Sequence, residues 1–291
     1  SFAPSATILA NGDAPIFHSD ELPNPRLYFG FNYTEDSEMM AHYNTDGVLC
    51  PHCQSILHYK SITYSNLGKY YCPKCDFKRP ELNYAVTALN ELSLTGSSFD
   101  IDGTTFSIPI AGLYNIYNAL AAYSAAKFFG LSTEEIQEGF SKAQRVFGRQ
   151  ETFAVEDKEV MLNLIKNPVG FNQIVQLLSY EKEPFSLGVL LNDNPADGQD
   201  VSWIWDGDFE WLHALNAVDT AISGIRVEDL GVRMEVAGFE KMKVFKTNAE
   251  LIDWIRKAPT KKVNVLATYT ALLNLRKDFA KEGYLKEGMN G

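Results

Sequence analysis

The sequence predicts an α/β protein of two domains, with a small metal-binding element inserted into the first domain and a Rossmann-like fold in the second. Three observations lead to this prediction. The 291 residues are enough for one large domain or two medium ones. All four cysteines lie within residues 50–75. From about residue 159 onward, short apolar runs alternate with helical patterns, which is typical of a mostly parallel sheet covered on both faces.

The composition narrows the class of protein. Hydrophobic residues make up 45% and charged residues 22%, as is ordinary for a globular protein. The net charge of −11 argues against a nucleic-acid binder that relies on basicity. No run approaches roughly 18 apolar residues, so no transmembrane segment is predicted. Residues 1–15 lack the basic and apolar regions of a signal peptide.

The first region alternates between strand-like and turn-like stretches before it becomes helical. Strand-like runs lie at 6–9, 26–31 and 82–89, and a hairpin follows with its turn at Asp102-Gly103. An alanine-rich helix is expected over 114–129 and is ended by Gly130. A second helix is expected to begin after Ser132 as N-cap and to run to about residue 143.

The cysteines form the pattern C-x2-C-x18-C-x2-C, which is the spacing of a zinc ribbon, and they are Cys50, Cys53, Cys72 and Cys75. Four thiolates fill the tetrahedron of a Zn²⁺ ion and leave no open position, so the zinc is predicted to be structural. Two disulfides or a redox pair are the alternatives. The stretch between the pairs predicts a hairpin that turns at Asn66-Leu67-Gly68.

The predicted ribbon spans 47–82 and does not explain the chemistry of the protein. His52 and His58 are expected to lie outside the ligand set, because the cysteines already complete it. With zinc bound, residues 50–81 carry a net charge of about +1, which is a poor footprint for phosphate binding. We therefore look for the chemistry elsewhere in the chain.

The second region begins near the stretch VFGRQETF, residues 146–153. Strands are expected at 159–165, 186–191, 220–223, 241–245 and 263–267, with helices at 169–179, 229–237, 249–258 and 269–280. In parallel sheets, ligands bind beyond the carboxyl ends of the strands. The polar clusters at these ends are KNP at 166–168, NDNPADGQD at 192–200 and SGIR at 223–226.

Several motifs resemble those of the Mur ligase family. The stretch GLYNIYNALAA at 112–122 resembles the G-x-[HY]-N-x-x-N-A-L-A-A signature of these enzymes. ILANGDAP at 8–15, GRQE at 148–151 and KNP at 166–168 resemble three further family motifs in the same order. The inserted ribbon, with the stretches 192–206 and 223–238, is similar to the MurT family, the ligase-like subunits of lipid II isoglutaminyl synthases. The resemblance covers nearly the whole chain.

The resemblance implies the domains and the activity. Residues 1–148 would be part of the central, ATP-binding Mur ligase domain, and 149–291 the C-terminal domain. The enzyme would use ATP to activate the D-glutamate α-carboxylate of the lipid II stem peptide as an acyl phosphate. Ammonia from a partner glutaminase of the GatD type, a class I glutaminase, would then give D-isoglutamine. This heterodimer would act in the cytoplasm, at the inner face of the bacterial plasma membrane.

One departure from the family concerns ATP. Mur ligases hold the phosphates on a G-x-x-G-K-[ST] loop, and the 291 residues contain no such loop. We expect the chain to be a C-terminal fragment that needs the P-loop region for ATP hydrolysis.

The resemblance also implies which residues bind the nucleotide and Mg²⁺. The expected set is Asn11, Asp13, Asn115, Asn118, Arg149, Lys166 and Asn167. Asn11 and Asp13 would meet adenine or Mg²⁺, and Lys166 with Asn167 would face the phosphate or the substrate carboxylate. Plain turns, a helix cap and, for Arg149, an interdomain salt bridge are the structural alternatives.

The acidic loop at 192–206 is the most unusual stretch of the second region. The resemblance implies that one of its aspartates completes the Cys-His pair of the partner glutaminase, as a carboxylate does in other triads. Asp200 is the preferred candidate and Asp197 the second. The alternative is a solvated acidic loop.

Other residues of this region have weaker assignments. Trp203, Trp205 and Trp211 are expected as anchors of the partner interface, with burial the alternative for at least one. Arg226 and Arg233 are candidates for binding the anionic part of lipid II, with an ion pair to Glu228 or Asp229 as the ordinary explanation. Residues 268–270 are expected to line the same cleft.

Two other functions remain open from the sequence. The first is a conventional Mur ligase that adds an amino acid to a UDP-MurNAc-peptide. The second is a zinc-ribbon module that only binds protein partners. The ribbon and the acidic loop argue against the former, and nucleotide binding would exclude the latter.

Overall fold

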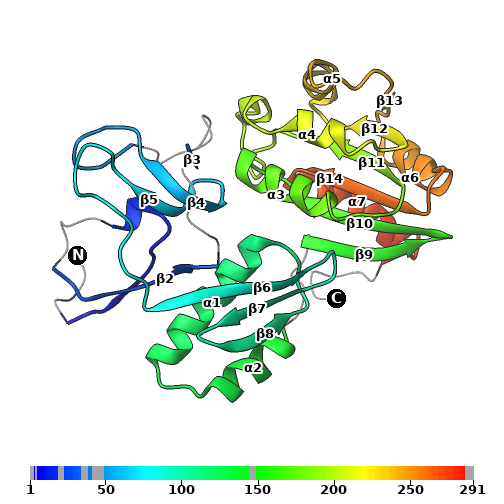
Figure 1. Ribbon diagram of the computed structural model, residues 1–291. Coiled ribbons are helices and arrows are strands. Elements are labelled where there is room, and N and C mark those ends of the chain that lie inside the picture. Colours follow the sequence, from blue (N-terminus) through cyan, green and yellow to red (C-terminus); the bar gives the residue numbers. More distant parts are fainter. Residues whose placement is uncertain are drawn as a thin grey trace. The chain divides into compact units, whose positions relative to one another are not determined.

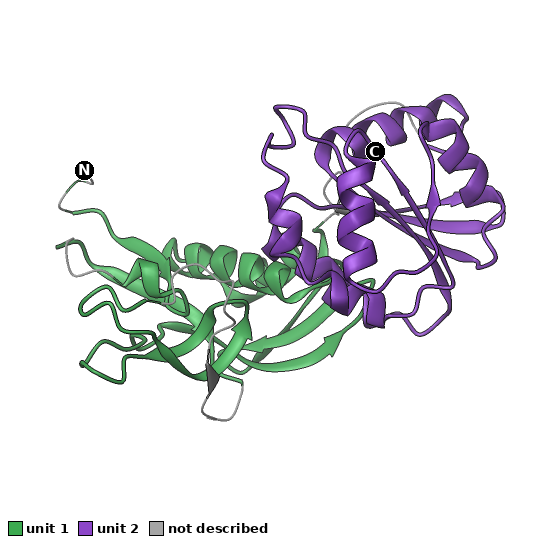
Figure 2. Ribbon diagram, turned by 90° about the horizontal axis from the view of Figure 1, so that it is seen from above, with its two compact units in different colours: residues 1–144 green, residues 145–291 purple. Residues whose placement is uncertain are grey.

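The computed structural model describes residues 3, 5–18, 23–33, 39–40, 49–143 and 149–285, without the side chains of 39, 40 and 149. The chain divides into two compact units, residues 1–144 and 145–291 (Figure 2). Each has its own buried core, and each is described by itself below.

The first unit contains a five-stranded sheet in the order β1-β2-β6-β7-β8 (Figure 1). The strands are β1 (Ile8–Asn11), β2 (Arg26–Phe31), β6 (Tyr84–Leu92), β7 (Ser97–Ile101) and β8 (Thr104–Ile108). β1, β2 and β6 are parallel, whereas β6, β7 and β8 form an antiparallel meander. The hairpin predicted around Asp102-Gly103 is confirmed, and the first strand lies two residues later than predicted.

Two helices pack with this sheet, α1 (Leu113–Phe128) and α2 (Thr133–Ser141). Their apolar residues share one cluster with Phe99, Ile101 and Phe106 of the meander. The predicted N-cap of α2 is confirmed, because Ser132 and Glu135 form a reciprocal capping box. A short 3-10 helix, η1 (Pro15–Phe17), follows β1.

The cysteine-containing insertion forms a small antiparallel sheet of β3 (Met39–Met40), β4 (His58–Tyr64) and β5 (Leu67–Tyr71). The predicted hairpin is present, but the turn predicted at 66–68 is wrong, since the turn residues are Ser65 and Asn66. Ser65 adopts the left-handed conformation itself, with φ of 53°. Gly68 lies within β5, where a Cβ would stand 2.1 Å from the Ser61 carbonyl oxygen, so this glycine permits close approach of the strands.

The second unit is built on a six-stranded sheet in the order β13-β12-β11-β14-β10-β9. The strands are β9 (Arg149–Val155), β10 (Lys158–Leu164), β11 (Phe185–Leu190), β12 (Asp219–Ser223), β13 (Lys243–Val244) and β14 (Lys262–Ala267). All neighbours are parallel except β9, which pairs antiparallel with β10. The predicted mostly parallel sheet is confirmed, and the antiparallel edge strand β9 is an addition to the prediction.

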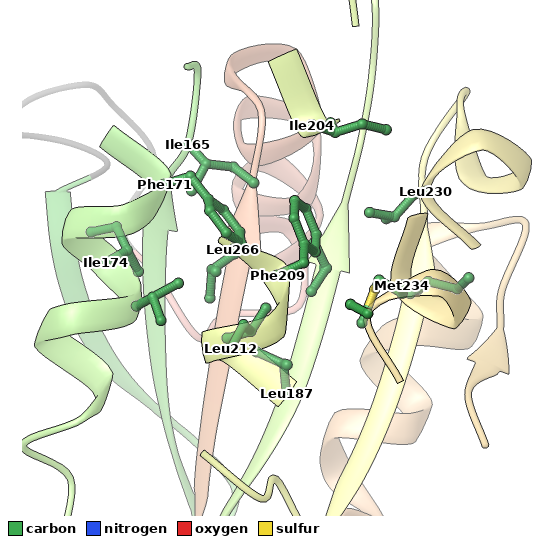
Figure 3. Packing of buried hydrophobic residues seen from close by; sticks show 14 of the residues in the cluster. Ile165, Phe171, Ile174, Leu187, Ile204, Phe209, Leu212, Leu230, Met234 and Leu266 are labelled. Atoms are coloured by element: carbon green, nitrogen blue, oxygen red, sulfur yellow. The ribbon is translucent and has the colours of Figure 1, made fainter. Parts of the chain in front are cut away.

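Helices cover both faces of this sheet, as in a Rossmann-like fold. They are α3 (Pro168–Leu178), α4 (Phe209–Ala214), α5 (Val227–Val236), α6 (Asn248–Arg256) and α7 (Tyr269–Lys281). Side chains of α3, α4 and α5 pack on one face, where Phe171 and Phe209 stack with their ring centroids 4.2 Å apart (Figure 3). Side chains of α6 and α7 form the core on the other face. The short α4 and the 3-10 helix η2 (Ser202–Trp205) were not predicted.

The parallel strands bring four chain segments to one edge of the sheet. β10, β14, β11 and β12 end at residues 164, 267, 190 and 223 and are neighbours in that order. The segments that follow them therefore lie beside one another at the carboxyl edge. Among the described residues, no helix is long and apolar enough to cross a membrane.

Candidate functional site

The four cysteine thiols converge in the insertion. Their sulfur atoms all lie within 4.8 Å of one another, and the pairs Cys50–Cys75 and Cys53–Cys72 are 3.5 Å apart. Four ligands at a Zn–S distance of about 2.3 Å lie about 3.8 Å from each other in a tetrahedron. The thiols therefore fit a tetrahedral metal ion, and they are free rather than joined in disulfides.

The surroundings of the thiols also suit a structural metal. Cys50 and Cys72 are buried and belong to a small cluster with Tyr59, Tyr70 and Phe77. Hydrogen bonds with Ser55 lower the pKa of the Cys53 thiol to about 6, whereas, against a hydrogen bond from the Phe77 backbone, burial and the neighbouring thiols raise the pKa of Cys75 to about 12. His52 and Asp76 lie near Cys75, but the cysteine set alone supplies four ligands.

Asp13, predicted to meet adenine or Mg²⁺, is completely buried and bonded to protein groups. Its carboxylate accepts hydrogen bonds from the Arg79 guanidinium at 2.8 Å, the Phe31 N–H at 2.7 Å and the Tyr117 hydroxyl at 2.9 Å. Burial raises the pKa of Asp13, and the charge of Arg79 opposes that rise. Gly30 permits the approach, since a Cβ there would stand 2.6 Å from the carboxylate. This geometry favours a structural role for Asp13.

The asparagines predicted to bind nucleotide differ in exposure. Asn115 is buried in the first turn of α1 and donates to the Ala111 carbonyl at 2.7 Å, but it does not cap the helix, whose N-cap residue is Gly112. Asn118, one turn later, is exposed and lies 3.4 Å from the Asn115 side-chain oxygen. Asn11 is half-buried at the end of β1, where its side-chain oxygen accepts the Asp13 N–H at 3.0 Å. Asn118 and Asn11 thus retain polar atoms for a ligand.

The remaining residues of the predicted nucleotide set belong to the second unit. Lys166 is exposed directly after β10. Asn167 is the N-cap of α3 and accepts the Gly170 N–H at 2.7 Å. Arg149 begins β9, and its side chain lies outside the described residues.

Hydrogen bonds join three of the segments at the carboxyl edge. The Asn192 backbone N–H donates to the Thr268 hydroxyl at 2.8 Å, and its side-chain oxygen accepts the Ile225 N–H at 2.9 Å. Gly224 allows this turn with φ of 105°, because a Cβ would stand 2.3 Å from the Leu191 carbonyl oxygen. The acidic loop is therefore attached to the ends of β12 and β14.

Asp197, the second candidate for the partner's triad, is 4% exposed and points into its own unit. Its carboxylate accepts the Thr270 backbone N–H at 2.7 Å, the Thr270 hydroxyl at 2.5 Å and the Asn194 N–H at 3.1 Å. The negative charge lies at the N-terminus of α7, which stabilises it. These contacts favour a structural role for Asp197.

Asp200, the preferred candidate, is exposed. One carboxylate oxygen accepts the Ser202 backbone N–H at 2.8 Å. Hydrogen bonds from Ser202 hold the pKa of Asp200 below its ordinary value of 3.8, so the side chain is anionic at neutral pH. A pocket of about 560 Å³ adjoins it, lined also by Trp205, Arg226 and Val232.

Arg226 and Arg233, the two candidates for binding the anionic part of lipid II, differ in exposure. Arg226 is partly exposed and pairs with Asp193 and Asp229 at 2.8 and 2.7 Å, which is the ordinary ion-pair explanation. Arg233 is 3% exposed, so the prediction that it binds an anionic substrate is wrong. Its guanidinium donates hydrogen bonds to the backbone carbonyl oxygens of Ile204 and Gly207 and to the Glu210 carboxylate.

The three tryptophans differ in exposure, and burial, the alternative to a role in the partner interface, applies to two of them. Trp203 and Trp211 are partly buried against the core below α3, α4 and α5. Trp205 is 51% exposed, and the Arg233 guanidinium lies 5.4 Å from the centroid of its ring. Only Trp205 of the three presents a large apolar surface beside Asp200.

Two residues organise these regions in ways that the sequence does not indicate. Nothing in the sequence pairs Arg79 with Asp13, 66 positions away. Thr270 was expected to line a cleft, but it holds Asp197. A larger pocket, of about 780 Å³, lies at the amino end of β12, away from the predicted residues.

Comparison with known proteins agrees with the motifs. Residues 164–272 match the model of the MurT ligase C-terminal family. The lipid II isoglutaminyl synthase (glutamine-hydrolyzing) subunit MurT of Streptococcus pneumoniae is 46% identical over 99% of the chain. The subunit of the same name from Staphylococcus aureus is 31% identical over 85% of the chain. The chain spans 65% and 57% of the length of these two relatives.

Solved structures with the same fold have lower identity. A pseudomurein peptide ligase type C from Methanothermus fervidus matches with a TM-score of 0.64 and 19% identity, over 94% of this chain and 56% of that one. MurF from Acinetobacter baumannii matches with a TM-score of 0.52 and 21% identity, over 68% of this chain and 45% of that one. The order of motifs, the fold and the sequence matches agree: the chain has the Mur ligase fold, it is similar to MurT subunits over nearly its whole length, and its residues 164–272 match the MurT ligase C-terminal family.

Proposed function

We propose that this chain is part of the ligase subunit of a glutamine-dependent amidotransferase that converts the D-glutamate of lipid II to D-isoglutamine. The observation that carries the proposal is the exposed, anionic Asp200 on a loop fixed to the carboxyl edge of the second sheet. The similarity to subunits named lipid II isoglutaminyl synthase MurT supplies the substrate class.

The proposed reaction has two steps on the ligase subunit. An oxygen of the D-glutamate α-carboxylate takes the γ-phosphoryl group of ATP, which gives an acyl phosphate and ADP. Ammonia then attacks the carbonyl carbon, the bond between this carbon and the phosphate oxygen breaks, and inorganic phosphate leaves with one proton from the nitrogen, which yields the amide. Activation is needed because a free carboxylate is a poor electrophile.

In the first unit, two asparagines are candidates for holding the nucleotide with Mg²⁺, and in the second unit a lysine is a candidate for contact with the substrate carboxylate. Asn11 and Asn118 retain polar atoms in the first unit, and Lys166 is exposed after β10 in the second. The phosphates would be held mainly by a loop of the G-x-x-G-K-[ST] type, which these 291 residues do not contain. The cysteine cluster would hold Zn²⁺ as a structural ion and would take no part in the reaction.

The ammonia would come from a partner glutaminase of the GatD type, which hydrolyses glutamine at a cysteine nucleophile. A Cys-His pair works best when a carboxylate orients the imidazole and stabilises its cation. Asp200 fits this role because it is exposed and anionic, whereas Asp197 is buried and already bonded. The exposed Trp205 and the pocket beside Asp200 would be part of the contact surface.

The test uses the complete ligase subunit that contains these residues, purified together with its glutaminase. The substitution Asp200→Asn should lower glutamine hydrolysis by roughly 10³-fold or more, by analogy with other triads that lose their carboxylate. Amidation of lipid II with added ammonium chloride should be unchanged, because it does not use the partner's cysteine. Mass spectrometry of the lipid product and a glutamate assay measure the two activities.

A matched control is Asp206→Asn, since Asp206 is an exposed aspartate at the other end of the same loop. This variant should keep both activities. Retention of glutamine hydrolysis by the Asp200→Asn complex would contradict the role proposed for Asp200. Failure of the wild-type complex to amidate lipid II, together with ligation of an amino acid to a UDP-linked peptide, would instead support a conventional Mur ligase.

A further inference from the structure

The Thr270 hydroxyl connects three side chains of the acidic loop to the N-terminus of α7. It donates to the Asp197 carboxylate at 2.5 Å and accepts from the side-chain amides of Asn192 at 2.9 Å and Asn194 at 2.8 Å. One donated and two accepted bonds use the full capacity of a hydroxyl group. The backbone N–H of Thr270 adds a second bond to Asp197 at 2.7 Å. Thr270 thus holds three side chains of the loop, and the Asn192 bonds to Thr268 and Ile225 fix the first residue of the loop in addition.

The end of the loop is fixed separately, by Arg233 of α5. Its guanidinium donates to the carbonyl oxygens of Ile204 at 2.9 Å and Gly207 at 3.0 Å. It also forms two bonds with the Glu210 carboxylate, at 2.8 and 2.7 Å. Because Arg233 is 3% exposed and lies on a packed helix, η2 cannot shift without breaking these bonds.

Asp200 lies between these two anchors. Only residues 198–201 separate Asp197 from Ser202, where η2 begins. A span of four residues with both ends fixed has few conformations available, so the position of Asp200 follows from its anchors. The Asp200 side chain contributes one further restraint, its bond to the Ser202 N–H.

We propose that Thr270 is a positioning residue for glutamine hydrolysis: through Asp197 it fixes the span 198–201 and so sets where Asp200 meets the partner's imidazole. The inference rests on the proposed function, because it assumes that Asp200 completes the partner's active site. Thr270 itself touches neither substrate nor the reacting atoms. Its effect should therefore appear in catalysis by the partner and not in the ligase reaction.

The experiment compares Thr270→Val with Thr270→Ser in the complete complex. Valine has the shape of threonine without the hydroxyl, whereas serine keeps the oxygen that bonds Asp197, Asn192 and Asn194. Thr270→Val should lower kcat for glutamine hydrolysis by roughly 10- to 100-fold, the effect of small misplacement of a catalytic group. KM for glutamine, affinity for the glutaminase and ammonia-dependent amidation should remain unchanged. Thr270→Ser should retain most of the wild-type kcat.

A milder variant keeps the test valid if Thr270→Val folds poorly. Asn194→Ala removes one of the two amides that bond Thr270 and leaves Asp197 bonded to the Thr270 N–H. It should show a smaller loss in the same kcat, again without a change in ammonia-dependent amidation. Thermal unfolding of each variant reports whether the fold is retained.

The outcomes separate this inference from the proposed function. If Asp200→Asn leaves glutamine hydrolysis intact, the proposed function of the loop fails. If Asp200→Asn abolishes hydrolysis but Thr270→Val and Asn194→Ala match the wild type, only the positioning inference fails. A parallel loss of ammonia-dependent amidation and partner affinity in folded Thr270→Val protein would show a general structural role and would also overturn the inference.

Discussion

At the scale of single residues, burial decides what an acidic side chain can do. Asp13 and Asp200 are both aspartates in polar stretches of the sequence, yet one is completely buried and the other exposed. Asp13 has its charge balanced by Arg79 and its oxygens bonded by Phe31 and Tyr117. A carboxylate held in this way supports the fold and has little capacity left for a ligand.

The substitution Arg79→Met should destabilise the first unit by about 3–5 kcal/mol, because it leaves a buried carboxylate without its cation. The Arg79 side chain is 7% exposed, so solvent cannot replace it. Unfolding in denaturant, followed by circular dichroism, measures the change in free energy.

Two further variants control for lost packing at position 79. The double variant Asp13→Asn with Arg79→Met should recover part of the lost stability, because the uncompensated charge is gone. Arg79→Lys should cost less than Arg79→Met. Equal losses of stability in all three variants would mean that the ion pair between Arg79 and Asp13 does not account for the loss.

At the scale of elements, local signals placed the helices well and the turns less well. The N-cap at Ser132 was predicted from the sequence because a cap is a local signal, and the structure adds the reciprocal bond of Glu135, three residues later. A similar box begins α6, where Thr247 caps the helix and Glu250 bonds back. The turn between β4 and β5 was predicted at the wrong residues, because glycine often marks a residue with positive φ. Gly68 instead lies within a strand, where it permits close packing of the two strands.

The box at α6 predicts a pH effect on stability. Hydrogen bonds, first from the Thr247 side chain and then from the backbone N–H groups of Lys246 and Thr247, lower the pKa of Glu250 from its ordinary 4.5. A depressed pKa in the folded state stabilises the fold above the unfolded value. This contribution is lost as pH falls through the folded value.

The wild-type protein should therefore lose more stability than the Glu250→Gln variant when the pH is lowered from 7 to below 4.5. Glutamine can keep an acceptor for Thr247 but does not titrate. Denaturant unfolding of both proteins at the two pH values measures the difference. Identical acid dependence in the two proteins would contradict a role for the ionised Glu250 side chain.

At the scale of the whole molecule, the chain contains separate cores with different sources of stability. The second unit has two large apolar clusters, one on each face of its sheet. Among the described residues, the cluster of the ribbon contains six buried residues, two of them cysteines. Such a small core needs a further constraint, and the four converging thiols can supply it by binding metal.

Removal of metal should therefore act on the first unit alone. Chelation, or the substitution Cys72→Ser, should release zinc and lower the unfolding temperature of the first unit, by about 10 °C for a loss of about 3 kcal/mol. The transition of the second unit should stay in place, since its clusters contain no residue of the ribbon. Metal analysis with calorimetry checks both statements.

Unchanged zinc content in the Cys72→Ser protein would contradict the four-cysteine site. A shift of both transitions would contradict the assignment of zinc to the first unit alone. The conservative comparison is Cys75→His, which keeps a metal ligand and should retain more zinc than Cys72→Ser.

The sequence by itself determined the features whose signals are local or ordered along the chain. The spacing of Cys50, Cys53, Cys72 and Cys75 predicted a metal cluster, because each pair needs only a tight turn. The alternation of strands and helices predicted the parallel sheet of the second unit, because parallel strands need crossover connections. The order of the motifs predicted the family.

Only the tertiary structure decided which polar residues remain available. Asp197 and Asp200 are three positions apart and were both candidates from the sequence, yet Thr270 of α7 binds the Asp197 carboxylate, whereas Asp200 is exposed. From the sequence, Arg233 is expected on the surface of a helix, but in the structure it is buried beneath η2. These outcomes depend on contacts between segments 29 to 73 positions apart, which no local pattern encodes. The fold first brings such segments together, and the scarcity of water in the interior then fixes which charges are paired inside and which stay exposed.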